Sequence, residues 1–205
     1  MAITTYAELK SAIADFLNRD DLTSVIPTFI AAAESQMQRE VRHYKMMQRS
    51  TAGIENRYTQ LPGNWLETIR FHVTGDKSYR IESTSMDDML QLRERGSVSG
   101  RPTHYAHIGQ TLEVYPTPDT SYTSELLYYE KIPALSDSVT TNWLLQDAPD
   151  MYLYGSLLHS APYLQDDARL ALWANLYAGA VQSVNDQSEK ARYSGAGMRV
   201  RISSY

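Results

Sequence analysis

MMQRSTAGI, residues 46–54, is where the hydrophobic pattern of this chain changes period. Before it, Ala33, Met37 and Val41 recur at the spacing of one helix face. After it, to residue 129, short apolar or β-branched runs alternate with Gly, Pro, Asn and Asp, a pattern typical of strands and turns. The sequence therefore predicts a β-rich section that directly follows a helix.

Two helices are predicted before this section. Thr5 and Glu8 have the spacing of a capping box, and an apolar stripe follows them. The second helix is introduced by Thr23 or Ser24 and accommodates Pro27 in its first turn. We expect these two helices to form an antiparallel hairpin.

Seven strands and one short helix are predicted within the β-rich section. Ser85, followed three residues later by Asp88, marks the start of the short helix. The predicted strands are residues 46–54, 57–61, 68–73, 79–81, 104–108, 111–115 and 121–130.

Two more helices are predicted near the C-terminus. Pro149 suits the first turn of one, and Asp166 and Asp167 favour the start of the other. The expected inward stripe of the first helix is Tyr154, Leu157, Leu158 and Ala161. The expected buried face of the second is Leu170, Trp173, Tyr177, Ala180, Val181 and Val184.

The predicted fold class is therefore α+β. Two N-terminal and two C-terminal helices form a bundle from residues 1–45 and 140–189, and an antiparallel β-rich domain, 46–139, is inserted between them. An extended basic arm, residues 190–205, completes the chain.

The charge balance separates this arm from the rest of the chain. Four basic and no acidic residues lie in 190–205, whereas the whole chain has 19 basic and 24 acidic residues. The remainder thus has 15 basic residues against 24 acidic ones, which argues against a general nucleic-acid binder. The chain has no cysteine and no apolar run long enough to cross a bilayer, so we expect no disulfide and no membrane span.

The arm has the pattern of a two-sided strand. Met198, Val200 and Ile202 alternate with Arg199 and Arg201, which would place apolar groups on one face and guanidinium groups on the other. Such a strand is suited to adding onto another subunit's sheet edge or groove. The alternative is a frayed, solubilising terminus.

Two glycines, Gly195 and Gly197, precede this strand as a hinge. The candidate partner-binding residues of the arm are Arg192, Tyr193, Met198, Arg199, Val200, Arg201 and Ile202.

Motifs for chemistry are weak, and we expect neither an enzyme nor a metal or cofactor site. His104 and His107 lie three apart on a strand and so face opposite sides, and GSL at 155–157 lacks the second glycine of a nucleophile elbow. One hydrolase hypothesis remains open: Glu113 and Glu125 could form the carboxylate pair of a cell-wall glycan hydrolase if their strands are neighbours.

A carbohydrate-binding module is the other alternative, because aromatic rings on the β section could stack on sugars. The tyrosines concerned are Tyr105, Tyr115, Tyr122, Tyr128 and Tyr129.

Three stretches stand out together: Phe29, Ile30, Ala33, Glu34 and Arg39 in the second helix, LPGNWLE at 61–67, and IPALSD at 132–137 leading to NWL at 142–144. In these stretches, in length and in element order, the chain resembles the head-to-tail adaptor (connector) proteins of tailed bacteriophages.

The resemblance implies a virion structural protein in the neck between head and tail, assembled in the host cytoplasm. It implies a ring of identical subunits, commonly twelve, with the helical bundles side by side and the β sections toward the tail. The implied partners are the portal protein and a tail or nozzle protein, and DNA passes through the channel without sequence-specific binding.

Overall fold

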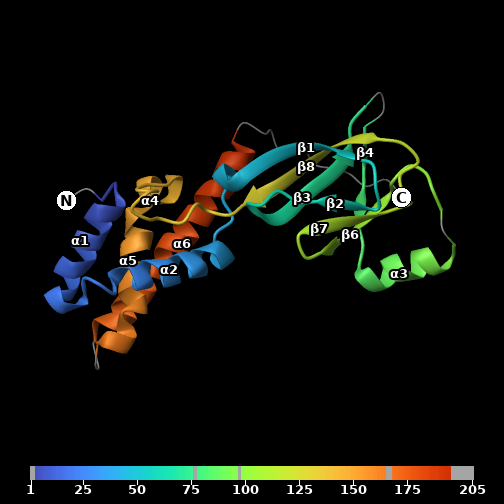
Figure 1. Ribbon diagram of the computed structural model, residues 1–205. Helices are drawn as coiled ribbons and strands as arrows, with labels where there is room; N and C mark the ends of the chain where they lie inside the picture. Colours follow the sequence, from blue (N-terminus) through green and yellow to red (C-terminus); the bar gives the residue numbers. More distant parts are fainter. Residues whose placement is uncertain (1–2, 76–77, 97, 165–167, 195–205) are drawn as a thin grey trace. The chain divides into compact units, whose positions relative to one another are not determined.

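The computed structural model of this 205-residue chain describes residues 3–75, 78–96, 98–164 and 168–194 (Figure 1). The chain divides into two compact units, residues 1–45 with 132–205 and residues 46–131. The described part of the first unit is helical and the second is mostly β-sheet, which confirms the predicted α+β class.

Residues 132–139, which the sequence placed with the β section, group with the helical unit. The reason is a set of hydrogen bonds between side chains of the second helix and the backbone of this segment. Gln38 Nε2 donates to the Ile132 carbonyl at 2.7 Å, and Glu34 Oε1 accepts from Leu135 N–H at 2.8 Å.

Helix α1 (Tyr6–Leu17) begins with the predicted capping box. Glu8 N–H donates to Thr5 Oγ1 at 3.3 Å, and Thr5 N–H donates to Glu8 Oε2 at 3.0 Å. The helix ends at Asn18, whose φ of 51° is the left-handed conformation that commonly stops a helix.

Helix α2 (Ile26–Glu40) starts later than predicted, after a 3₁₀ turn, η1 (Asp20–Leu22), and it has Pro27 in its first turn as expected. The expected antiparallel hairpin of α1 and α2 is not the main packing. Both helices lie chiefly against α5 (Pro149–His159), and Figure 1 shows α2 running across it. The hydrophobic periodicity of α1 and α2 predicts that each is a helix, but it does not predict that a third helix, α5, packs against both.

Helix α5 is the centre of the helical unit, because α1, α2, α4 (Trp143–Asp147) and α6 (Arg169–Tyr193) all contact it. The predicted inward stripe is wrong except for Leu157: Tyr154, Leu158 and Ala161 are only half-buried. A helix surrounded on several sides has no single inward stripe. The residues it buries are Met151, Tyr152, Leu153, Gly155, Ser156 and Leu157.

After α5 the chain passes through a 3₁₀ turn, η3 (Ala161–Tyr163), into α6. Helix α6 buries Trp173, Tyr177, Ala180 and Val184, four members of the predicted face, while Leu170 and Val181 are half-buried. It continues to Tyr193, so the first four residues assigned to the arm are helical. None of the helices among the described residues has the length and apolar character needed to span a bilayer.

Two four-stranded sheets form the β unit, in the orders β1-β8-β3-β4 and β2-β7-β6-β5. A 3₁₀ turn, η2 (Tyr44–Met46), leads into it. All strand pairs are antiparallel except β5 with β6. The elements are β1 (Met47–Ile54), β2 (Tyr58–Gln60), β3 (Trp65–Val73), β4 (Tyr79–Arg80), β5 (Glu82–Ser83), α3 (Met86–Glu94), β6 (His104–Ile108), β7 (Thr111–Tyr115) and β8 (Tyr122–Glu130).

The prediction missed β5, because two residues are too short to show a period, and it began β3 three residues late. The chain enters the β unit through β1 and leaves it through β8, and these strands are paired neighbours, with Met47 opposite Tyr129.

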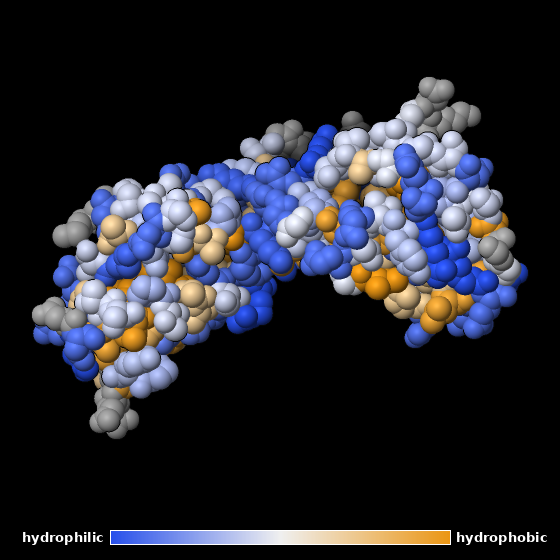
Figure 2. Space-filling model, in the orientation of Figure 1, coloured by the Kyte–Doolittle hydropathy of each residue, from blue (hydrophilic) through white to orange (hydrophobic). Residues whose placement is uncertain are grey.

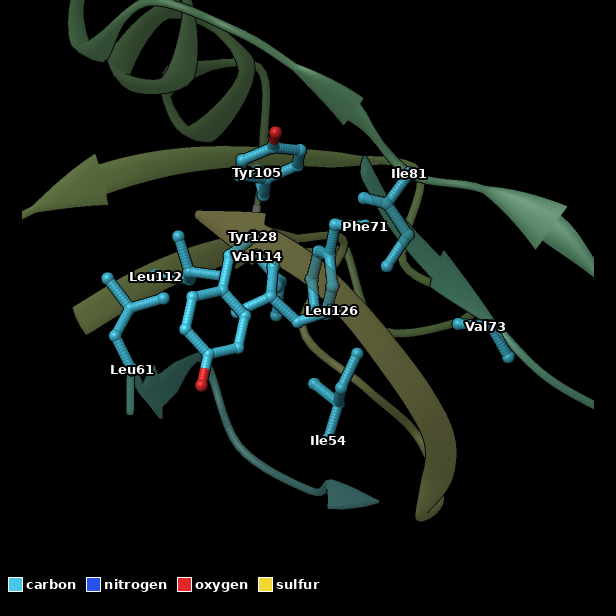
Figure 3. Close-up of a cluster of buried hydrophobic side chains, with 10 residues drawn as sticks. All are labelled: Ile54, Leu61, Phe71, Val73, Ile81, Tyr105, Leu112, Val114, Leu126 and Tyr128. Carbon is cyan, nitrogen blue, oxygen red and sulfur yellow. The ribbon is translucent and has the colours of Figure 1, made fainter. Parts of the chain in front are cut away.

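The core of the β unit draws side chains from both sheets (Figure 3). Phe71 of β3 meets the ring of Tyr105 of β6 edge to face, with centroids 5.4 Å apart. This is the packing of a β-sandwich, in which inner faces interdigitate. The buried cluster is Ile54, Leu61, Phe71, Val73, Ile81, Tyr105, Leu112, Val114, Leu126 and Tyr128.

Candidate functional site

A polar network in the helical unit brings together residues from two of the stretches that carry the resemblance. Glu34 Oε1 on α2 accepts hydrogen bonds from the Tyr152 hydroxyl at 3.2 Å and from Leu135 N–H at 2.8 Å. Asn142 Nδ2 donates to the Tyr152 oxygen at 2.7 Å and to the Pro133 carbonyl at 2.8 Å. The network therefore anchors the segment 132–142 against α2 and α5.

Asn142 also begins α4, because its Oδ1 accepts a hydrogen bond from Leu145 N–H at 2.8 Å. Burial raises the pKa of Glu34, and the hydrogen bonds from Leu135 N–H and the Tyr152 hydroxyl offset part of that rise in pKa. Burial, followed by the charge of Glu34, raises the pKa of Tyr152. These groups hold a shape and form no nucleophile–base pair.

The LPGNWLE turn makes a comparable anchor within the β unit. Asn64 Oδ1 accepts from the Tyr128 hydroxyl at 3.0 Å, its Nδ2 donates to Glu130 Oε2 at 2.8 Å, and its carbonyl accepts from Lys131 N–H at 2.8 Å. Trp65 Nε1 donates to Thr68 Oγ1 at 3.0 Å. The turn thus fixes the end of β8.

The carboxylate pair of the hydrolase hypothesis is not assembled. Glu113 lies on β7 and Glu125 on β8, which belong to different sheets and are not neighbours. The carboxylate of Glu113 is only 2% exposed and binds Arg57 Nε at 2.7 Å and Arg93 Nε at 3.2 Å. A buried carboxylate between two guanidinium groups is a structural ion pair, so the hydrolase hypothesis loses its premise.

The five tyrosines of the sugar-binding alternative do not form one platform. Tyr105 and Tyr128 belong to the buried core. Tyr115 packs beneath Arg93, 5.0 Å from its ring centroid, and the Tyr122 hydroxyl donates to Asp119 at 2.6 Å. Tyr129 is half-buried on β8, seven residues from Tyr122 and so on the opposite face of that strand. The five rings therefore do not present one exposed surface for stacking on sugars.

The side chains of the two histidines and the serine considered above are half-buried or buried. His104 Nδ1 lies 2.8 Å from Thr103 Oγ1, while His107 packs against Trp65, and burial lowers the pKa of His107. Ser156 is fully buried on α5. Within the described ranges, no group of three or more His, Asp or Glu residues could hold a metal ion.

An apolar surface on α6 was not anticipated from the sequence. Leu172 and Leu176, four residues apart and so on one helix face, are 56% and 39% exposed. Gly179, where an added Cβ would meet open space, continues that face. Figure 2 shows apolar surface set among polar surface on the helical unit. The signal was present, because both leucines lie outside the predicted buried stripe.

A groove of about 580 Å³ lies beside this surface, between α2, α5 and α6. The Tyr177 hydroxyl donates to Glu40 Oε2 at 2.8 Å in this groove, and burial raises the pKa of Tyr177. Its lining is Gln36, Glu40, Leu158, Ala174, Tyr177, Ala178, Val181, Gln182 and Asn185. A concave, largely apolar lining of this kind suits a side chain or segment from another polypeptide.

The residues predicted for partner binding lie at or beyond the end of α6. Arg192 is exposed on its last turn and Tyr193 is its last residue. The side chain of Tyr193 and the residues Met198, Arg199, Val200, Arg201 and Ile202 lie outside the described residues. Their role as a docking arm therefore stays a prediction.

Comparison with known proteins agrees with a structural protein. The family model described as SU10 adaptor protein matches residues 4–201, which include both units and most of the arm. No curated protein matches the chain. Because the family match extends over nearly all of the 205 residues, the chain belongs to the SU10 adaptor protein family and is a structural phage adaptor.

Proposed function

We propose that this chain is the head-to-tail adaptor of a tailed phage and forms a closed ring between the portal and the tail. The family match over residues 4–201 is the observation that carries this proposal. The internal networks at Glu34, Asn142 and Asn64 support it, because they shape the chain and assemble no reactive group.

A ring requires two different surfaces on each subunit, one meeting the other on the next copy. Helix α6 supplies candidates for such surfaces, since Leu172 and Leu176 form an exposed apolar ridge and the groove beside Ala178 is concave. We take twelve subunits as the expected number, with the portal protein on one side and a tail or nozzle protein on the other. The ring would sit in the virion neck, after assembly in the host cytoplasm.

The charge of the chain suits a channel through which DNA passes. The net formal charge is −5, and the segment 102–189 has eleven acidic residues against Lys131 and Arg169. Acidic or neutral walls do not hold phosphates, whereas a basic lining would slow the passage of DNA. The same balance argues against sequence-specific DNA binding.

Electron microscopy of the purified full-length chain, alone and mixed with cognate portal rings, tests the proposal. We expect ring-shaped density beneath the portal, and the symmetry of class averages gives the number of subunits. Portal rings that remain bare at micromolar concentrations of the chain would contradict the proposal.

A further inference from the structure

Strand β1 is an unusually long free edge in the β unit. Of the four sheet edges, β1 has eight residues, whereas β2 has three and β4 and β5 have two each. β1 pairs with β8 along its whole length without a register shift, unlike β3 with β8. No residue of the described ranges pairs with the outer side of β1.

Natural proteins protect long sheet edges with charges, prolines, bulges or short strands, because an open edge offers unpaired backbone groups to any other strand. The β1 sequence, MQRSTAGI, contains one charged residue, Arg49, and no proline. Its eight residues span about 26 Å. Apart from Arg49, this edge lacks the usual protection, and it has room for a whole added strand.

We infer that the outer edge of β1 is the docking site for residues 198–202 in the arm of a neighbouring copy of this chain. The inference rests on the proposed ring and deepens it by naming where the arm binds. Residues 198–202 carry a strand pattern, and at about 17 Å they fit within the length of the edge.

The two faces of β1 match the two faces of the arm. Ser50 is opposite Leu126, so even-numbered β1 residues lie on the core side of the sheet, where Ala52 is small and exposed. An added strand with Met198, Val200 and Ile202 on that side would extend the apolar core face beyond Ala52.

The other face carries the carboxylate of Glu125 on β8, together with Arg49 on β1. Thr51 is opposite Glu125, whose Oε1 is 3.9 Å from Arg49 Nη1 and 3.7 Å from His72 Nε2, distances too long for hydrogen bonds. A strand added to β1 is two strand spacings, about 10 Å, from β8. The long side chains of Arg199 and Arg201 would reach across β1 to this carboxylate.

Disulfide trapping tests the assignment directly, because the natural chain has no cysteine. Copies with Thr51→Cys and copies with Arg199→Cys or Arg201→Cys, carrying different tags, are mixed, assembled on cognate portal rings and oxidised. We expect a disulfide between the two tags. The matched control replaces Thr51→Cys with Ala178→Cys in the α2–α5–α6 groove, and we expect at least about tenfold less product from it.

Each other result of the trapping overturns the inference. A product that favours Ala178→Cys would place the arm in the groove, and a disulfide within one chain, seen when both cysteines are in the same copy, would make the occupant the chain's own arm. If electron microscopy shows rings but no disulfide forms, the docking site is wrong while the proposed function stands. If no ring forms on portal, both fail.

A backbone test separates strand addition from simple side-chain binding. Val200→Pro removes a backbone N–H at the centre of the segment 198–202 and fixes φ there, whereas Val200→Thr keeps that N–H and the β-branched shape. We expect the trapped product to fall about tenfold with Val200→Pro and to stay within about twofold with Val200→Thr. The opposite order would indicate apolar side-chain binding without strand pairing and would overturn the inference.

Discussion

Glu34 and Gly155 show what single residues contribute to the helical unit. The carboxylate of Glu34 accepts hydrogen bonds from Leu135 N–H and from the Tyr152 hydroxyl. Neither of these two donors is a basic group. Gly155 lies where α5 approaches α6 and α2: an added Cβ would be 3.0 Å from the Tyr177 ring and 3.2 Å from Met37 Cε. Glu34 thus holds the loop at Leu135 against α2, and Gly155 permits α5 to pack closely against α6 and α2.

The charge of Glu34 makes the stability of the chain depend on pH. Burial raises the pKa of Glu34 above its ordinary 4.5, so the folded state binds this proton more tightly than the unfolded state. The protonated Glu34 side chain therefore contributes to the unfolding free energy below pH 4.5, and this contribution is lost as pH rises through the raised pKa of Glu34. We expect the unfolding free energy of wild type, relative to Glu34→Gln, to fall with rising pH across this window in urea titrations. A difference that is constant with pH would contradict this assignment.

Two glycine substitutions should act in opposite directions. Gly155→Ala forces a methyl group against Tyr177 and Met37, so we expect the unfolding free energy to drop by about 1–3 kcal/mol. Gly179→Ala is the matched control on α6, where nothing lies within 4 Å of the added Cβ. Higher helix propensity should raise its unfolding free energy by about 0.5–1 kcal/mol. Urea denaturation of both variants measures this, and equal effects would refute the packing argument.

At the scale of elements, local signals predicted well and non-local ones did not. The helix starts at Thr5 and Ser85 were predicted because capping needs only residues three positions apart. The hairpin of α1 and α2 is not their main packing, and the stripe of α5 was wrong except for Leu157, because burial of a helix depends on neighbours that are distant in sequence. For the same reason the strands of Glu113 and Glu125 were possible neighbours in sequence but lie in different sheets.

The candidate site divides in the same way. The arm was predicted from a local pattern of charge and alternation and stays a prediction, because residues 198–202 lie outside the described ranges. The groove at Ala178 and the free edge of β1 required the packing of helices and the strand order. Leu172 and Leu176 fall between these two cases, because the sequence showed their helical spacing but only the structure showed that they are exposed.

The exposed ridge of α6 should matter for assembly more than for folding. Leu172→Glu replaces a side chain that is 56% exposed, so we expect the unfolding free energy to change by less than about 1 kcal/mol. Ring formation on portal, seen by electron microscopy, should be lost because a carboxylate would be buried in an apolar contact. Asn175→Glu, an exposed position on the same helix, adds the same charge without removing the leucine and should still form rings. Rings formed equally by both variants would exclude the ridge from the interface.

For the whole molecule, folding and joining should be separable. A chain that ends at Ser194 retains α6 to Tyr193 and every helix and strand of the described residues, so we expect an unchanged circular dichroism spectrum and thermal midpoint. It should fail to join portal in co-sedimentation. A chain that ends at Ile202 is the control, since it retains all the candidate arm residues. If the shorter chain joins portal as well as the control does, the arm is not a docking element.

The pairing of Met47 with Tyr129 has a consequence for how this protein can diversify. The chain enters and leaves the β unit through adjacent strands, so the two junctions are only about 5 Å apart within that unit. Domains whose two ends lie this close together are the ones that a host fold tolerates as insertions. The β unit therefore has the end spacing that replacement by another domain, with the helical unit kept, would require.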